Sequence, residues 1–120
     1  MKILAIDDDL SVLDTIERLL ADTDHVVDCF QSACAAVDAA EAGDYDFMLV
    51  DYKMPEKDGI WFMKNAPVAP KTKSLLVTAY ANQDIIQEMF RLGISGYIIK
   101  PFDRDELLRH LDYHSSSDDQ

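Results

Sequence analysis

The sequence predicts a doubly wound α/β domain with a five-stranded parallel sheet flanked by five helices. Short apolar runs alternate with amphipathic segments five times along the 120 residues, which is the pattern of repeated strand–helix units. Most of the runs are continuously apolar, as expected for parallel strands that are covered on both faces. A chain of this length can bury a core of its own, so we expect a single domain.

The predicted strands are short and are distributed over the whole chain. Each is an apolar run bounded by polar or turn-forming residues. We expect them at residues 2–6, 26–30, 47–50, 75–78 and 97–99. The second of these leads into no acidic or basic side chain, which is typical of a strand at the edge of the sheet and away from a site.

The five helices are predicted from apolar stripes and from capping residues. In the first helix the stripe begins at Val12, and Ser11 with Asp14 is placed as a capping box. The later helices have their own start and stop signals. The expected starts are Ser32, a position near Gly59, Asn82 or Asp84, and Asp103, and the expected ends of the second and fourth helices are Gly43 and Gly93.

Composition limits the location and the partners of the protein. There is no signal peptide and no apolar run of membrane-spanning length, so we expect a cytoplasmic protein without membrane contact. The net charge of −12 disfavours direct binding to nucleic acid and suits a divalent cation or a basic partner. The domain is expected to span residues 1–114, and residues 115–120 are expected to form a disordered polar tail or the start of a linker.

The few polar residues at strand ends carry the functional signal. Asp7 and Asp8 follow the first strand, Asp51 follows the third, Thr78 ends the fourth and Lys100 follows the fifth. The carboxyl ends of parallel strands meet at one edge of an open sheet, where ligands bind. We therefore expect these side chains to converge, although each alone has a plain structural explanation as a helix cap, a turn or a strand residue.

This set of groups suits metal-assisted phosphoryl transfer. Two carboxylates about 4 Å apart repel each other by about 4 kcal/mol at an effective dielectric constant near 20, so a cation is expected between them. Three carboxylates are hard oxygen ligands, which favour Mg²⁺ (or Mn²⁺) over zinc. An ammonium and a hydroxyl group beside a carboxylate would stabilise a phosphoryl group that is transferred to it.

Four stretches of the sequence carry a resemblance to a known family. They are LAIDDDLSVL, FMLVDYKMPEKDG, LLVTAYA and GISGYIIKPF. Together they resemble the response-regulator receiver domain of two-component signalling, over about residues 2–113. The resemblance implies a flavodoxin-like fold with the strand order 2-1-3-4-5.

The resemblance also implies a role for each site residue. Asp51 aligns with the phosphoacceptor, Asp8 with a direct metal ligand and Asp7 with a ligand that acts through a metal-bound water. The backbone carbonyl of Lys53 would be a further metal ligand. Asp9 has no general role in the family, so we expect it to cap the first helix. The other implied roles are a hydrogen bond to the phosphoryl group from Thr78, the amide of Ala79 beside it, a charge pair from Lys100, a cis peptide at Pro101 and an aromatic switch at Tyr97.

The implied function is signalling rather than turnover of a separate substrate. A sensor histidine kinase or a histidine phosphotransfer protein would donate the phosphoryl group to Asp51. The face formed by the fourth helix, fifth strand and fifth helix would then change shape and signal to an output domain or partner, with a homodimer through the same face as one form. Lys53 and Tyr80 flank the phosphoryl position, so we expect slow loss of phosphate.

Two other functions fit parts of the pattern. Asp7-Asp8-Asp9-Leu10-Ser11 resembles the nucleophile motif of haloacid dehalogenase phosphatases, but a later acidic motif is missing. A receiver-like module that only binds proteins is the second alternative, and the full set of polar residues argues against it. A calcium-binding loop starting at Asp7 fails, because Val12 stands where glycine is needed and Arg18 where glutamate is needed.

Overall fold

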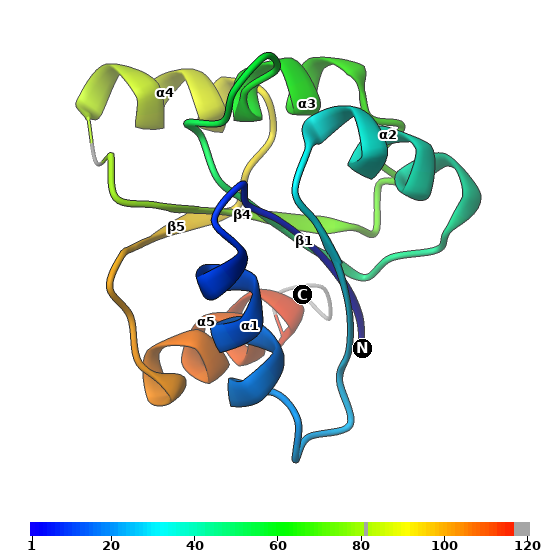
Figure 1. Ribbon diagram of the computed structural model, residues 1–120, viewed down its shortest axis with the longest axis vertical. Helices are drawn as coiled ribbons and strands as arrows, with labels where there is room; N and C mark the ends of the chain where they lie inside the picture. Colours follow the sequence, from blue (N-terminus) through cyan, green and yellow to red (C-terminus); the bar gives the residue numbers. More distant parts are fainter. Residues whose placement is uncertain (81, 117–120) are drawn as a thin grey trace.

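One five-stranded parallel sheet forms the centre of the protein, and its order is β2-β1-β3-β4-β5. The computed structural model describes residues 1–80 and 82–116 (Figure 1). Strands and helices alternate along the chain, as the apolar pattern predicts. The elements are β1 (Lys2–Ile6), α1 (Leu10–Leu19), β2 (Val26–Phe30), α2 (Ala33–Ala42), β3 (Phe47–Val50), α3 (Gly59–Asn65), β4 (Lys73–Thr78), α4 (Gln83–Arg91), β5 (Gly96–Ile99) and α5 (Arg104–Ser116).

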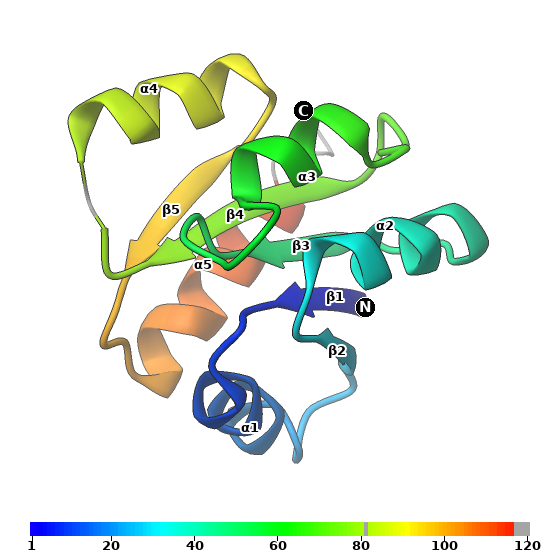
Figure 2. The same cartoon turned by 45° about the horizontal axis from the view of Figure 1, so that its top comes forward.

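Helices cover both faces of the sheet and divide the core into two layers (Figures 1 and 2). Helices α2, α3 and α4 pack on one face, around Leu4, Met48 and Leu76. Helices α1 and α5 pack on the other face, around Ile3 and Leu75. Successive residues of a strand point to opposite faces, so a strand covered on both sides must be apolar throughout. This explains why the first, third and fourth strands read as continuous apolar runs.

Side-chain caps fix where the helices begin. Ser32 and Asp58 accept hydrogen bonds from backbone amides in the first turns of α2 and α3. Of the two candidates for α4, Asn82 is the cap, and Asp103 accepts a bond from the amide of Glu106 at the start of α5. Such caps satisfy amides that have no partner within the helix, and each contributes about 1 kcal/mol.

Four sequence-based boundaries are corrected by the structure, and the smallest correction is at β5, which begins at Gly96 rather than at residue 97. The cap of α1 is Asp9, whose side chain accepts a bond from the Ser11 amide. The expectation that Asp9 caps the first helix is therefore confirmed, and the predicted capping box at Ser11 is wrong. Strand β4 begins at Lys73, two positions before the predicted start. Helix α5 continues to Ser116, so residues 115 and 116 of the predicted tail are helical. The remainder of that tail, residues 117–120, lies outside the described residues.

The strand order brings the ends of four strands together. Ile6 pairs in register with Val50, so the residues that follow, Asp7 and Asp51, leave the sheet side by side. On the other side of β4, Thr78 pairs with Ile99, the residue before Lys100. Strand β2 lies at the far edge, next to β1. None of the helices in the described part of the chain is long and apolar enough to cross a bilayer.

Candidate functional site

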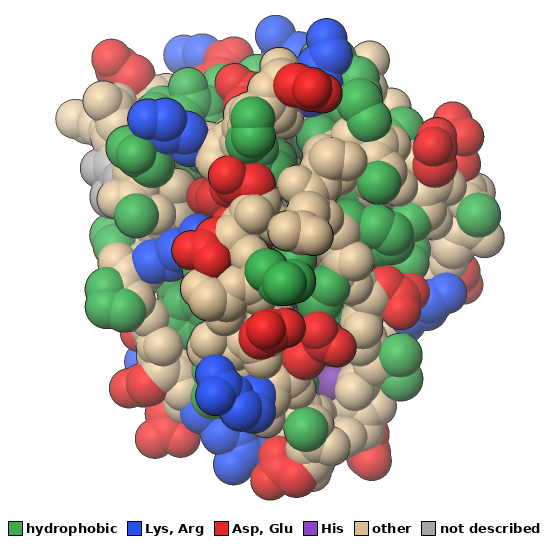
Figure 3. All heavy atoms as spheres, in the orientation of Figure 1, with side chains coloured by type: hydrophobic (Ala, Val, Ile, Leu, Met, Phe, Trp, Pro, Cys, Tyr) green, Lys and Arg blue, Asp and Glu red, His purple; other side chains and the backbone are tan. Residues whose placement is uncertain are grey.

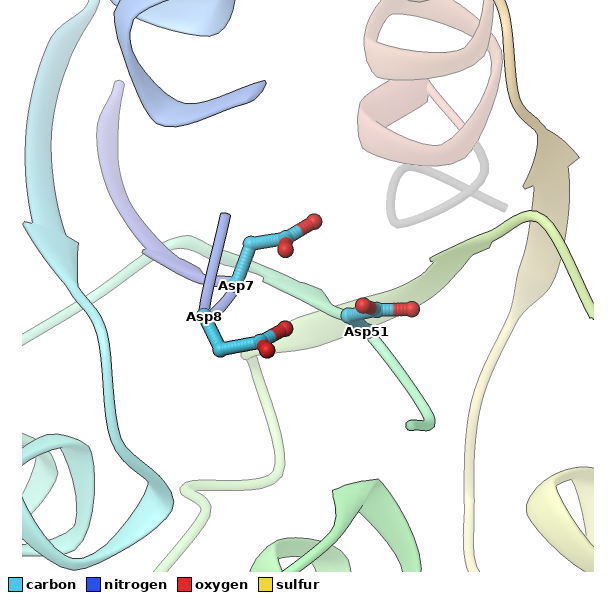
Figure 4. A group of neighbouring side chains, drawn as sticks. All are labelled: Asp7, Asp8 and Asp51. Carbon is cyan, nitrogen blue, oxygen red and sulfur yellow. The ribbon is translucent and has the colours of Figure 1, made fainter. Parts of the chain in front are cut away.

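Three carboxylates meet at the carboxyl edge of the sheet. Asp7, Asp8 and Asp51 each offer one oxygen, and these oxygens lie within 4.8 Å of one another. Asp7 and Asp51 are buried, whereas Asp8 is exposed. Figure 4 shows Asp7 and Asp8 at the end of β1, with their carboxylates turned to the side on which Asp51 lies. The sequence-based expectation that these residues converge therefore agrees with their positions.

Lys100 supplies the positive charge in this cluster. Its ammonium contacts Asp7 Oδ2 and lies 3.3 Å from Asp51 Oδ2. The lysine enters the site from the end of β5, where the Lys100–Pro101 peptide bond is cis. Among the described residues, Lys100 contacts two of the three carboxylates, Asp7 and Asp51, so the cluster has an excess of negative charge over this ammonium group.

The charges of the site shift the pKa of two of its members. Burial, and then the charge of Asp7, raise the pKa of Asp51, although Lys100 and Thr78 act in the opposite direction. Burial alone would lower the pKa of Lys100, but its hydrogen bond to Asp7 and the charges of Asp51 and Asp7 outweigh it, so the net direction is upward. Lys100 is therefore a fixed cation at neutral pH.

Backbone amides hold the two buried carboxylates in place. The amide of Tyr52 donates to Asp51 Oδ1 over 2.8 Å, and the amide of Asp9 donates to Asp7 Oδ1 over 2.9 Å. The loop after β3 also approaches Asp51 closely, because a Cβ atom at Gly59 would lie 2.4 Å from the Asp51 carbonyl oxygen. Only glycine fits at this contact without a backbone shift.

A cavity of about 510 Å³ opens over the acidic cluster. Lys53 and Tyr80 line its wall together with the carboxylates and Lys100. Lys53 Nζ lies 3.2 Å from Tyr80 Oη and 4.6 Å from the centre of the tyrosine ring. Thr78 is buried at the end of β4, and its hydroxyl oxygen accepts a bond from the Tyr80 amide, whereas Ala79 is exposed.

The predicted switch residue, Tyr97, lies on β5 away from the acidic cluster. Its side chain is exposed and makes an edge-on contact with Phe90 of α4, with 6.4 Å between the ring centres. Phe90 falls within the helix that the sequence predicts between Asn82 or Asp84 and Gly93, but sequence reasoning gave it no role. The supporting amides of Tyr52 and Asp9 and the close contact at Gly59 were also missed, and the Asp58-Gly59 pair was the one signal for a tight loop there.

The donor set fits a hard divalent cation. Carboxylate oxygens and a backbone carbonyl are ligands that Mg²⁺ accepts, and it commonly keeps several waters, so a cluster open to a solvent-filled cavity suits it. The exposed Asp8 lies on the open side of the cluster. Lys53 lines the cavity, and Ala79 follows Thr78 at the end of β4. The roles of the Lys53 carbonyl as a metal ligand and of the Ala79 amide beside the phosphoryl group remain predictions.

Comparisons with known proteins identify the family. The model of the response regulator receiver domain matches residues 3–112. The chain is 33% identical to chemotaxis protein CheY-3 of Vibrio cholerae over 116 residues, which cover 93% of this chain and 89% of that protein.

Two solved structures share the fold. A CheY-like receiver domain from Methanospirillum hungatei has a TM-score of 0.91 at 26% identity, covering 97% of this chain and 94% of that one. The receiver domain of the sensor histidine kinase PA1611 from Pseudomonas aeruginosa has a TM-score of 0.83 at 28% identity, covering 93% and 94%, and holds a magnesium ion in its active site cleft. The chain therefore belongs to the response regulator receiver domains of two-component systems.

Proposed function

We propose that the protein accepts a phosphoryl group on Asp51 from a phosphohistidine of a sensor histidine kinase or a histidine phosphotransfer protein. The observation that carries this proposal is the buried position of Asp51 between a second carboxylate and Lys100. A carboxylate without a function would gain little from such a place, because burial beside another negative charge raises its pKa. The same surroundings suit a group that attacks phosphorus.

The chemistry follows from the geometry. A carboxylate oxygen of Asp51 attacks phosphorus, the new P–O bond forms, and the P–N bond to the donor imidazole breaks. The bonding electron pair returns to the imidazole nitrogen, and the donor ring leaves as neutral imidazole because its other nitrogen carries a proton by the time the bond breaks. Lys100, which lies 3.3 Å from Asp51, would stabilise the developing charge on a phosphoryl oxygen, and the Thr78 hydroxyl at the end of β4 would donate to another.

Asp7, Asp8 and Asp51, with the Lys53 carbonyl, would hold Mg²⁺ or Mn²⁺ for this reaction. The bound cation would neutralise charge on the equatorial oxygens of the phosphoryl group. The magnesium ion in the related PA1611 receiver domain supports this proposal. Asp8 would be the direct ligand, and Asp7, which contacts Lys100, would act through a water.

The output would be a change of the α4-β5-α5 face. Phosphorylation adds about −1.5 to −2 charge units at Asp51. Thr78 would move toward the new oxygens, and Tyr97 would turn inward from its exposed position beside Phe90. The altered face would bind an output domain, a partner or a second copy of the chain. Acidic and basic side chains are interspersed over much of the face shown in Figure 3, and the net charge of −12 favours protein rather than nucleic acid partners.

The protein would have no separate substrate to turn over, and its proposed place of action is the cytoplasm.

Asp51→Asn tests the acceptor assignment. The purified protein is incubated with Mg²⁺ and acetyl phosphate or carbamoyl phosphate, and the mass increase of a phosphoryl group is followed. We expect uptake by the unsubstituted chain and none by the variant, because the amide cannot attack phosphorus. Retained labelling of the variant would contradict the assignment, and steady release of phosphate from a monoester would favour a phosphatase.

A further inference from the structure

A small cavity opens beside the last two turns of α5. Its volume is about 250 Å³, and its described lining residues are Arg109, His110, Tyr113 and His114. Each of these side chains carries an N–H or O–H group that can donate a hydrogen bond, and none of them is acidic. This lining contrasts with the chain as a whole, in which 23 acidic residues outnumber 11 Lys and Arg residues. The donors around the cavity therefore suit an anion.

The two histidines have fixed positions in the wall of the cavity. The rings of His110 and His114 stack with 5.9 Å between their centres and 18° between their planes, and the Tyr113 ring meets His114 edge-on at 5.0 Å. His114 is buried against the start of β5, where a Cβ atom at Gly96 would lie 2.8 Å from His114 Nε2. Residues four apart on a helix share one face, so both imidazoles border the same space.

Arg109 differs from the other arginines of the chain. Those three each contact an oxygen of a neighbouring side chain, in the pairs Arg18–Thr15, Arg91–Glu88 and Arg104–Asp22. The Arg109 guanidinium is exposed and makes no ion pair or hydrogen bond among the described residues. A planar guanidinium donates two parallel hydrogen bonds to an oxyanion, so Arg109 is available for such a ligand.

The surroundings of the cavity favour an anion over a metal cation. Burial, and then the charges of His110 and Lys73, lower the pKa of His114. Positive charge that opposes a proton on this imidazole also opposes a metal ion bound to it. The one group of three or more possible metal ligands in the described part of the chain contains no histidine. An anion would instead be attracted by Arg109 and Lys73.

We propose that this cavity binds a small tetrahedral oxyanion of the phosphate type, either free or as the end group of a small molecule. Arg109 would hold two of its oxygens, and the imidazoles and the Tyr113 hydroxyl would donate to the others. The volume of about 250 Å³ lies below the about 300–1,000 Å³ of pockets for drug-sized ligands, so the occupant is small. The cavity lies near the start of β5, far along the strand from Lys100 and Asp51. The inference therefore does not rest on the proposed function.

Histidine titrations followed by NMR test the proposal. The chain has three histidines, and His25, which does not line the cavity, is an internal control. The pKa of each imidazole is measured in sodium sulfate and in sodium chloride at matched ionic strength. Sulfate is the probe because it is tetrahedral and keeps its double charge over the whole pH range. We expect the pKa values of His110 and His114 to be higher in sulfate by about 0.3 or more, since a bound anion favours the charged imidazole.

Two arginine variants locate the effect. Arg109→Gln should abolish the sulfate-dependent rise, because it removes the bidentate donor. Arg109 is exposed, so this variant should keep the fold. Arg104→Gln is the matched control, since it makes the same charge change on the same helix at a residue that pairs with Asp22. The rise should persist in this control.

The outcomes decide the proposal without reference to Asp51. Equal rises at all three histidines, the same response in both arginine variants, or no difference between sulfate and chloride would each overturn it, because only a general salt effect would remain. Amide shifts in titrations with inorganic phosphate and with glycerol phosphate then identify the source. Tighter binding of the ester assigns an end group, equal or weaker binding assigns the free ion, and no binding of either overturns the proposal. Labelling that survives Asp51→Asn would overturn the proposed function and leave this inference untouched.

Discussion

The two edges of the sheet use charged residues in opposite ways. At the amino edge, Asp46 accepts a bond from the Lys2 amide, and Lys71 lies 2.9 Å from Asp44 and 3.8 Å from Asp46. Those acidic side chains are 80% and 41% exposed. At the carboxyl edge, the side chains of Asp7 and Asp51 are 4% and 7% exposed and share a single lysine with each other.

The difference separates structural charges from functional ones. Exposed carboxylates are solvated by water, so their charges cost little free energy. The acidic residues at the amino edge therefore need no functional explanation. Buried carboxylates that outnumber their cations carry a free-energy cost that packing alone does not justify. The excess of negative charge, rather than the presence of acidic residues, marks the carboxyl edge as the site.

The largest effect is expected from Asp8→Ala. The substitution removes the exposed residue that is proposed as the direct metal ligand, and with it one of three neighbouring negative charges. Mg²⁺ binding should be lost, and the metal-free protein should become more stable by about 0.5–1 kcal/mol, since the relieved repulsion is partly screened by water. Calorimetry and urea unfolding with and without Mg²⁺ measure both effects.

Asp44→Ala is the control for that experiment, because it removes an acidic residue from the amino edge, where Lys71 is its partner. It should leave Mg²⁺ binding unchanged. A metal-free Asp8→Ala protein that is less stable than the unsubstituted chain would contradict the repulsion argument.

A smaller effect is expected from the side chains at the mouth of the cavity. Lys53 and Tyr80 contact each other in the wall of the cavity that Asp51 also lines, and we expect them to restrict the approach of water to a phosphorylated Asp51. Tyr80→Ala should therefore shorten the lifetime of the phosphorylated protein by about threefold or more, which corresponds to about 0.7 kcal/mol of barrier. The decay of the phosphorylated mass with time gives the rate.

Lys57→Ala serves as the control for this measurement, since Lys57 lies over Trp61 and does not line the cavity. Its decay should match that of the unsubstituted chain. A half-life of seconds for the unsubstituted protein in Mg²⁺-containing solution would refute slow phosphate loss altogether.

Much of the fold could be predicted because the apolar runs and the turn-forming residues that follow them indicate the same strand limits. The strands at residues 2–6, 26–30 and 47–50 have the predicted bounds, since their apolar residues end where turn-forming residues begin. The start of β4 was missed because Lys73 and Ser74 are polar. Hydropathy gives no strand signal at these two positions. They belong to the strand because Lys73 pairs with Phe47 and Ser74 pairs with Met48 in the neighbouring strand.

The start of α1 shows a limit of local rules. Asp9 and Ser11 are both good capping residues, and sequence reasoning pointed to each of them, to Ser11 through the capping-box pattern and to Asp9 because it has no general role in the family. In the structure the Asp9 carboxylate accepts bonds from both the amide and the hydroxyl group of Ser11, over 2.9 and 2.7 Å. Because the Asp9 carboxylate accepts two hydrogen bonds, Asp9 caps the helix instead of Ser11. Sequence spacing alone does not reveal which of two candidate caps the chain will use.

The convergence of the site was predictable, but its internal pairing was not. Strand-end positions and the winding of the sheet predict that Asp7, Asp51 and Lys100 meet. Which carboxylate Lys100 contacts depends on side-chain conformations that no pattern encodes. The same holds for the contact of Phe90 with Tyr97, which joins two elements with no shared motif.

The pH dependence of stability tests the free-energy cost of burying Asp51 at the carboxyl edge. Burial, and then Asp7, raise the pKa of Asp51 above the ordinary value of 3.8, so the folded state disfavours its ionised form. The folded protein thus loses stability from this group as pH rises from below 3.8 through the raised pKa. Asp51→Asn cannot ionise and should be more stable than the unsubstituted chain at neutral pH without metal. The difference in free energy of unfolding between the variant and the unsubstituted chain should shrink as the pH falls toward 3.8. Urea unfolding that gives an equal difference at every pH would contradict this prediction.

The smallest effect is expected from Lys71→Ala at the amino edge. Lys71 pairs with Asp44 and Asp46, but all three side chains are well exposed, so water replaces the lost contacts. The urea midpoint should not change measurably, and Mg²⁺ binding should be unaffected because the residue lies at the opposite end of the strands. A clear loss of stability would show that the amino edge depends on its ion pairs, and exposure would then fail as the property that separates the two edges.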